Sequence, residues 1–208
     1  MSEYENALLN GTKQLGLKLT DSQCKQLLAY HALMIKWNKA YNLTAIRDPR
    51  EMISRHIIDS LAILPFIKGQ RIIDVGTGAG LPGVVLAIMF PEKELVLLDS
   101  NGKKTRFLIQ VKTELALDNM QVENCRVESY EPGQGFDIVT SRAFASLQDM
   151  LNWTGQLVSS NGCFLAMKGI NPIDEIEAIP EGFSVIATHQ LDVPGSDGER
   201  HLLEIKKA

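Results

Sequence analysis

A glycine-rich segment at residues 72–83 carries the pattern best suited to chemistry. It reads Ile-Ile-Asp-Val-Gly-Thr-Gly-Ala-Gly-Leu-Pro-Gly, after an apolar run and before a helix-like stretch. Glycine lets the chain turn sharply off a strand and removes the Cβ atoms that keep a ligand from the backbone. The free N–H groups at the start of the following helix attract polar ligands. The segment therefore predicts a nucleotide-binding loop and not only a structural turn.

The spacing of the glycines discriminates between nucleotide ligands. A dinucleotide fingerprint is GxGxxG, but here Leu81 occupies the place of its third glycine. Asp74 also lies two residues before the first glycine, which gives the form D-x-G-x-G-x-G. This form resembles the first motif of S-adenosylmethionine-dependent methyltransferases, whose cofactor has no pyrophosphate to bind at the helix. Gly76, Gly78 and Gly80 are therefore predicted to contact S-adenosylmethionine.

Acidic residues follow the next strand-like runs. Asp99 ends the second run, where an acid can bind the ribose hydroxyls of adenosine. It can also cooperate with Ser100 or Asn101 in capping the next helix. Val127 and Glu128 stand at the end of the third run, which lies near the adenine in this fold. Backbone groups there, together with Glu128, can receive the exocyclic amine, although Glu128 alone is typical of a surface residue.

The fourth run ends in Ser-Arg-Ala-Phe at residues 141–144, on the sheet edge where open α/β sheets bind ligands. The acid or asparagine followed by Pro-Pro that is typical of exocyclic-amine methyltransferases is missing. Cys125 and Cys163 are not placed for the nucleophile of a pyrimidine C5 methyltransferase. A ring nitrogen such as guanine N7 attacks without losing a proton, so no catalytic acid or base is expected. Arg142 is predicted to position the reactants through the cofactor carboxylate or an RNA phosphate, with a structural salt bridge as the alternative.

The elements that must position these residues change character near residue 69. Before it, the pattern predicts two helices, one capped by Thr20 or Asp21 and one by Asp48. After it, short apolar runs alternate with helix-length segments, which indicates a parallel sheet with helices on both faces. Strands are expected at 71–75, 94–98, 121–127, 136–141, 163–168, 184–193 and 201–206, and helices at 82–90, 103–117, 147–158 and 173–179.

The turn between the last two runs is short, and a short connection permits only an antiparallel hairpin. The predicted fold class is α/β, a Rossmann-like S-adenosylmethionine-dependent methyltransferase fold. Its mostly parallel seven-stranded sheet is expected to end in an antiparallel hairpin. Residues 1–68 are interpreted as an N-terminal helical extension packed on the core, and residues 69–208 as the methyltransferase domain.

The composition excludes other classes of protein. With 45% hydrophobic and 22% charged residues, the chain is typical of a folded protein and not of a disordered one. The longest apolar run, at residues 84–90, is far shorter than the roughly 20 residues a bilayer requires, so no membrane partner is expected. The three cysteines form no CxxC pair and the N-terminus lacks a secretory signal, so a cytoplasmic setting without a metal site is expected.

Basic residues are clustered although the net charge is −4. Lys103, Lys104, Arg106 and Lys112 stand together without acids, and residues 36–56 hold a second cluster. For either cluster alone, a solvated helix face is as good an interpretation as contact with RNA. The negative net charge argues against strong electrostatic binding of nucleic acid by this protein alone.

Separated motifs over nearly the whole chain are similar to those of the glucose-inhibited division protein B family. They lie at residues 36–44, 55–60, 80–83, 98–100, 141–144 and 198–201. Members of this family are bacterial small-subunit ribosomal RNA methyltransferases. The resemblance implies methyl transfer from S-adenosylmethionine to nitrogen 7 of a guanine in 16S RNA, as free RNA or in an assembled 30S subunit. It also implies a cofactor site that uses Gly76, Leu81, Val127, Glu128 and Arg142.

The resemblance further assigns an RNA-facing site to polar residues whose role the pattern leaves open. These are Asn42, His56, Asp59, Lys168 and Arg200. Taken alone, His56 is typical of a partly buried structural histidine, because its helix is otherwise apolar. Other functions stay open: an NAD-dependent oxidoreductase, which would need the missing third glycine; a non-catalytic module that binds the methyl donor or RNA; and a methyltransferase of another RNA or a small molecule.

Overall fold

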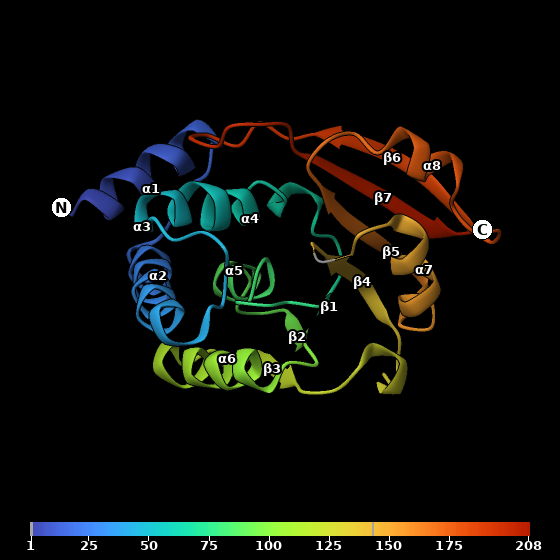
Figure 1. Ribbon diagram of the computed structural model, residues 1–208, viewed down its shortest axis with the longest axis horizontal. Helices are drawn as coiled ribbons and strands as arrows, with labels where there is room; N and C mark the ends of the chain where they lie inside the picture. The colour runs from blue at the N-terminus through green and yellow to red at the C-terminus, as the bar shows by residue number, and fades with distance from the viewer. Residues whose placement is uncertain (1, 143) are drawn as a thin grey trace.

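The computed structural model describes residues 2–142 and 144–208, which form an α/β fold around a seven-stranded sheet (Figure 1). The strand order is β3-β2-β1-β4-β5-β7-β6. The strands are β1 (Arg71–Val75), β2 (Glu94–Leu98), β3 (Met120–Glu123), β4 (Phe136–Ser141), β5 (Val158–Lys168), β6 (Phe183–Gln190) and β7 (His201–Lys207). Strands β1 to β5 are parallel, whereas β7 pairs antiparallel with β5 and β6. The predicted fold class, with its terminal hairpin, is confirmed.

Helices cover both faces of this sheet. They are α1 (Glu3–Gln14), α2 (Asp21–Tyr41), α3 (Pro49–Met52), α4 (Asp59–Leu61), α5 (Gly83–Met89), α6 (Gly102–Leu115), α7 (Leu147–Thr154) and α8 (Ile173–Glu177). A π-helical segment, η1 (Ile53–Ile58), joins α3 to α4, and 3-10 turns form η2 (Leu64–Phe66) and η3 (Val127–Ser129). In the described part of the chain, no helix is long and apolar enough to cross a membrane.

Successive apolar residues of β1 and β2 belong to different apolar clusters, because successive side chains of a strand point to opposite faces. On β1, Ile72 packs in the cluster that includes α2, α5 and α6, and Ile73 packs in the cluster that includes α7. The N-terminal helices contribute Leu27 and Met34 to the first cluster. The extension therefore shares its core with α5 and α6, while a division of the chain at residue 69 stays a prediction.

Local sequence signals fix the ends of the N-terminal helices. Thr20 caps α2 by accepting the Gln23 N–H, and the Gln23 side chain accepts the Thr20 N–H in return. Asn42 ends α2 in the left-handed conformation, at a φ of 51°. Asp48 caps α3 as expected, but the chain then becomes π-helical in η1. Apolar spacing does not distinguish one π-turn from α-helix.

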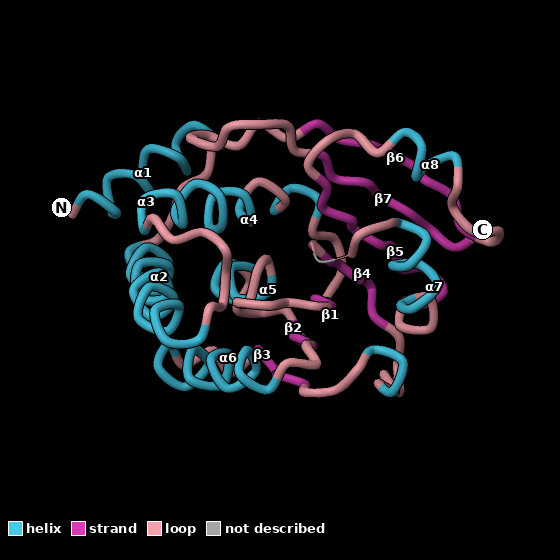
Figure 2. Tube along the Cα trace, in the orientation of Figure 1, coloured by secondary structure: helices cyan, strands magenta, loops and turns pink. Residues whose placement is uncertain are grey.

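Several predicted boundaries were wrong, and the largest differences lie in β3, α7, β5 and β6, which ends at Gln190 instead of residue 193. Strand β3 stops at Glu123, not 127, because its partner β2 stops at Leu98, directly opposite. Helix α7 ends at Thr154, and β5 begins at Val158 instead of Cys163. After Val158, β5 continues with Ser-Ser-Asn-Gly at residues 159–162, which is not an apolar run and was not recognised as strand. The loops that leave β1 and β4 start from neighbouring strands and bound the candidate site (Figure 2).

Candidate active site

The glycine-rich loop folds back on itself between β1 and α5. Gly76, Gly78 and Gly80 have φ angles of 67°, 62° and 96°, a region that other residues rarely adopt. A Cβ atom at Gly80 would collide with Val84, so close packing also requires glycine there. A Cβ atom at Gly78 would meet no atom within 3.8 Å, its nearest neighbours lying at 3.9 Å. The backbone at Gly78 is therefore not closely packed, although its N–H is bonded to Asp99.

Two carboxylates hold this loop. Oδ2 of Asp74 accepts hydrogen bonds from the Thr77 hydroxyl at 2.7 Å and the Gly83 N–H at 2.8 Å. Oδ2 of Asp99 accepts the Gly78 N–H at 2.9 Å. Burial raises the pKa of Asp74 to about 7, although its bonds to Thr77 and Gly83 act in the opposite direction. Oδ1 of Asp74 is buried and has no hydrogen-bond partner among the described residues.

Asp99 also contributes to the start of α6. Its Oδ1 accepts the Asn101 N–H at 2.9 Å, and Asn101 in turn caps α6 by accepting the Lys103 N–H. Nζ of Lys104 lies 3.8 Å from Oδ2 of Asp99. Asp99 nevertheless lines a cavity beside the loop. The two interpretations of this residue are thus compatible, because one carboxylate supports the helix start and still faces a ligand space.

That cavity, of about 240 Å³, lies where β1, β2 and β4 end. Its walls combine an acid suited to ribose hydroxyls, an acid and backbone suited to an adenine amine, and two aromatic rings. They include Gly76, Asp99, Val127, Glu128, Phe144 and Trp153. The rings of Phe144 and Trp153 meet edge to face, 5.8 Å apart between centroids. These residues fit an adenosine-containing cofactor. Trp153 carried no sequence signal, because an aromatic residue on an amphipathic helix is typical of core packing.

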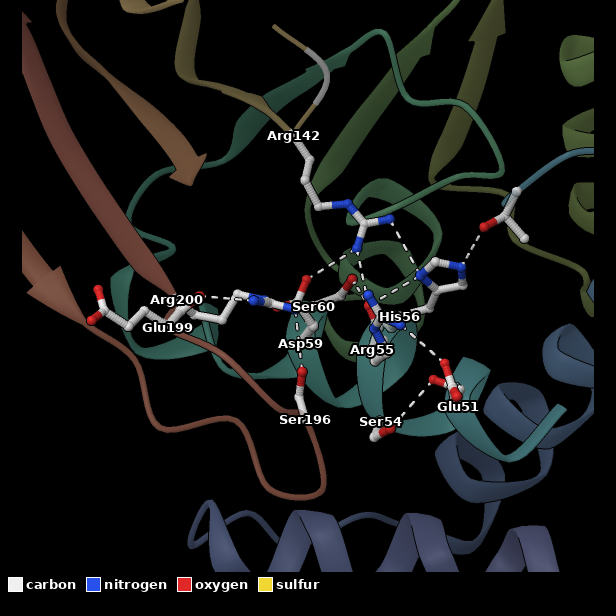
Figure 3. Close-up of polar contacts among 11 residues, drawn as sticks. Glu51, Ser54, Arg55, His56, Asp59, Ser60, Arg142, Ser196, Glu199 and Arg200 are labelled. Atoms are coloured by element: carbon white, nitrogen blue, oxygen red, sulfur yellow. Dashed lines mark hydrogen bonds and ion pairs between the residues drawn. The ribbon is translucent and has the colours of Figure 1, made fainter. Parts of the chain in front are cut away.

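Polar side chains distant in sequence converge on Asp59 (Figure 3). Arg142, just beyond β4, places Nη1 3.0 Å from Oδ2 of Asp59. Arg200, just before β7, places Nε 3.0 Å from Oδ1 of the same carboxylate. The side chain of Asp59 is only 3% exposed. One buried carboxylate therefore bridges two guanidinium groups, which in Figure 3 approach it from different directions.

His56 lies beside this bridge in the π-helical segment. Its Nε2 is 2.8 Å from the Thr44 hydroxyl, and its Nδ1 is 3.0 Å from the carbonyl oxygen of Arg55. Burial, followed by the nearby charge of Arg142, lowers the pKa of His56 to about 4. The ring is therefore neutral at neutral pH, with Nδ1–H donating to Arg55 and Nε2 accepting from Thr44. Thr44 is itself held by Asn38, whose Oδ1 accepts the Thr44 N–H at 2.9 Å.

A larger cavity, of about 870 Å³, adjoins the first, and Phe144 lines both. Its walls combine four cationic side chains, those of Arg55, Arg142, Lys168 and Arg200, with the acidic side chains of Asp59, Asp174 and Glu175. The neutral ring of His56 also lines it. Each of the four cations is paired with an acid of the protein, so a polyanionic substrate would contact them in competition with these ion pairs.

Lys168 is engaged within the protein. Its Nζ lies 2.8 Å from Oε2 of Glu175 in α8 and donates to the carbonyl of Ala145 at 3.2 Å. The same Glu175 oxygen accepts the N–H of Leu147 at 2.6 Å. The ion pair thus fastens the connection from β4 to α7, close to Arg142. Sequence reasoning offered Lys168 as an RNA contact but did not anticipate this partner.

Other predicted site residues lie elsewhere. Lys103 and Arg106 are exposed on α6, whereas Lys104 faces Asp99. Asn42 is exposed at the end of α2. Leu81 is buried in the core, where its N–H donates to the Thr77 carbonyl. The motif at 141–144 includes Ala143, which lies outside the described residues. Among residues 2–142 and 144–208, no group of His, Cys, Asp and Glu is arranged to hold a metal ion.

Comparison with known proteins finds relatives over nearly the whole chain. The family described as "rRNA small subunit methyltransferase G" matches residues 23–203. The "Ribosomal RNA small subunit methyltransferase G" of Ectopseudomonas mendocina is 57% identical over 207 residues, which cover 99% of this chain and 97% of that protein. Its counterpart in Pseudomonas syringae pv. syringae is 54% identical over 205 residues, which cover 99% of this chain and 96% of that protein.

Solved structures with little sequence similarity share the fold. The glycopeptide N-methyltransferase MtfA, complexed with S-adenosyl-L-methionine, gives a TM-score of 0.62 at 11% identity, covering 74% of this chain and 87% of that chain. TrmN from Thermus thermophilus gives a TM-score of 0.56 at 14% identity, covering 75% of this chain and 53% of that chain. At this level of identity the likeness establishes the fold alone.

Proposed function

Because the chain belongs to the rRNA small subunit methyltransferase G family, we propose that it transfers a methyl group from S-adenosylmethionine to nitrogen 7 of a guanine in small-subunit ribosomal RNA. The observation that carries this proposal is the pair of adjoining cavities that share Phe144. The smaller has the residues of an adenosine site, and the larger has the cations that a nucleic-acid backbone requires.

The smaller cavity and the loop would hold the cofactor. Asp99 would accept hydrogen bonds from the ribose hydroxyls, and Glu128 with the backbone of Val127 would receive the adenine amine. The open backbone at Gly78 would receive the amino-acid portion. When bound, the cofactor supplies a methyl group activated by a positively charged sulfur. The protein supplies the orientation of that group toward the larger cavity.

The polar residues of the larger cavity suit a reaction that needs no proton transfer. Nitrogen 7 of guanine carries an in-plane lone pair and attacks without losing a proton. His56 is neutral and both of its ring nitrogens have hydrogen-bond partners. Asp59 is held by Arg142 and Arg200. Neither side chain is arranged as a general base, so the contribution of this cluster is to align the base and its phosphates.

The decisive experiment is methyl transfer followed by mapping of the product. Purified protein, labelled S-adenosylmethionine and small subunits from cells that lack this protein should yield one 7-methylguanosine, located by nuclease digestion and mass spectrometry. Methylation of an exocyclic amine or of carbon 5 would contradict the proposed chemistry. Calorimetric titration with NAD tests the oxidoreductase alternative, and binding of NAD instead of S-adenosylmethionine would overturn the proposal.

A further inference from the structure

We infer that Tyr30, in the N-terminal helix α2, is a positioning residue for the glycine-rich loop, and through it for the cofactor. Its hydroxyl donates a hydrogen bond of 2.7 Å to the carbonyl oxygen of Ala79, between the second and third glycines of the loop. This inference rests on the proposed function, because it assigns Tyr30 to the use of the same cofactor site. The residue belongs to the helical extension and not to the strand and helix that flank the loop.

The environment of Tyr30 makes this contact well defined. The side chain is fully buried, and its ring stacks on Phe107 of α6 with centroids 6.4 Å apart. Burial raises the pKa of Tyr30 well above its ordinary value, so the hydroxyl keeps its proton and acts as a donor. Ala79 is also buried, so its carbonyl has little access to water as a substitute partner.

The contact of Tyr30 falls in the second half of the loop, which is otherwise held by its own backbone and, at its end, by the bond from Gly83 to Asp74. Its first half is tied to β2, because Gly76 and Thr77 donate to the Leu98 carbonyl and Gly78 donates to Asp99. In its second half, the N–H groups of Gly80 and Leu81 donate to Thr77, which lies within the loop itself. The hydroxyl of Tyr30 joins this half to a separate helix.

Loss of the hydroxyl would therefore act on the cofactor through the backbone. A buried carbonyl left without a donor costs free energy, and the peptide unit can recover it by rotating toward water or a neighbour. Such a rotation moves the backbone next to Gly78, where the loop is open to the ligand. The ring itself stays in place in Tyr30→Phe, so the packing against Phe107 is retained.

The test compares Tyr30→Phe with Thr12→Val. Thr12 is a matched control because its hydroxyl is also buried on an N-terminal helix and donates to a backbone carbonyl, that of Leu9. Calorimetry with S-adenosylhomocysteine should show a dissociation constant raised about tenfold in Tyr30→Phe, equivalent to about 1.4 kcal/mol, and unchanged in Thr12→Val. At saturating S-adenosylmethionine, kcat and the KM for small subunits should stay within about twofold of the unaltered protein.

A second measurement needs no cofactor. Hydrogen exchange of ligand-free protein should show the amides of residues 78–81 exchanging faster in Tyr30→Phe, with α7 unchanged as an internal reference. An unchanged dissociation constant together with unchanged loop exchange would overturn the inference and leave Tyr30 a packing residue. If Tyr30→Phe does not fold, hydrogen exchange of the unaltered protein provides the test. Amides of residues 78–81 that exchange much faster than the α2 amides around Tyr30 would also overturn the inference. If the unaltered protein binds no S-adenosyl ligand, the proposed function has failed instead.

Discussion

The guanidinium group of Arg142 lies 3.0 Å from the carboxylate of Asp59, although 82 residues separate them in the sequence. The contact joins the end of β4, beside the smaller cavity, to the N-terminal helices. The other oxygen of Asp59 is 3.0 Å from Arg200. The position of Arg142 therefore depends on two other segments of the chain, the one that holds Asp59 and the one that holds Arg200.

Replacement of Asp59 by alanine should leave both arginines without their buried partner. We expect the free energy of unfolding to fall by about 2–3 kcal/mol, less than for a fully buried pair because the arginines are partly exposed. Methyl transfer to small subunits should fall far more than affinity for S-adenosylhomocysteine. Urea denaturation measures the free energy of unfolding, a filter assay measures methyl transfer, and calorimetry measures the affinity for S-adenosylhomocysteine. Glu51→Gln, which breaks only the exposed pair with Arg55, is the control and should change stability by less than about 0.5 kcal/mol.

Gly78→Ala tests the open backbone of the loop. Alanine at a φ of 62° is strained, so unfolding should become easier by about 1 kcal/mol. Binding of S-adenosylhomocysteine should be lost because the added Cβ would occupy the space that we propose for the amino-acid portion of the ligand. Gly16→Ala is matched, because Gly16 has a φ of 70° and an added Cβ would meet nothing within 4 Å. Calorimetry that finds equal affinity in the two variants would refute this placement of the cofactor.

The pH dependence of stability should show the neutral His56. Its pKa is about 4 in the folded protein, below the ordinary value of 6.5, so the unfolded chain binds a proton more readily between these values. The stabilisation is fully present above pH 6.5 and is lost as the pH falls toward 4, by about 2–3 kcal/mol. Comparison with His56→Gln, by urea melts at several pH values, isolates this effect. The comparison is needed because Asp74 has the opposite pH dependence. Burial raises its pKa to about 7, so its contribution to the free energy of unfolding falls as the pH rises.

Charge reversal on α6 should separate RNA contact from cofactor contact. Lys103→Glu combined with Arg106→Glu should raise the KM for small subunits and weaken its salt dependence, without changing affinity for S-adenosylhomocysteine. Lys104→Glu should weaken cofactor binding, because its ammonium lies 3.8 Å from Asp99. Turnover on assembled subunits should exceed that on protein-free RNA at every salt concentration, since a net charge of −4 favours few phosphate contacts. An unchanged KM in the variant that combines Lys103→Glu and Arg106→Glu would show that this face of α6 contacts solvent and not RNA.

The sequence predicts local features of this protein better than distant contacts. Strands β1 and β2 were placed at their observed bounds, because each is a short apolar run with a clear turn after it. The glycine spacing predicted the loop, since φ angles above zero restrict residue type. The bridge at Asp59 left no such local mark, because its partners come from β4 and the segment before β7. Tyr30 was equally hidden, because an aromatic residue at helical spacing is typical of an ordinary core.

The double pairing of Asp59 would also affect how the proposed RNA site distinguishes its substrate from other polyanions. Cells are crowded with polymers rich in phosphate, and a site with free arginines would hold many of them indiscriminately. Arg142 and Arg200 are both paired with Asp59, so an RNA strand that contacts either arginine must compete with this carboxylate. Such competition gives little gain to flexible or poorly shaped polymers. A rigid RNA fold that makes several contacts at once would offset the loss of these ion pairs. The site would therefore distinguish its substrate at the binding step, before methyl transfer.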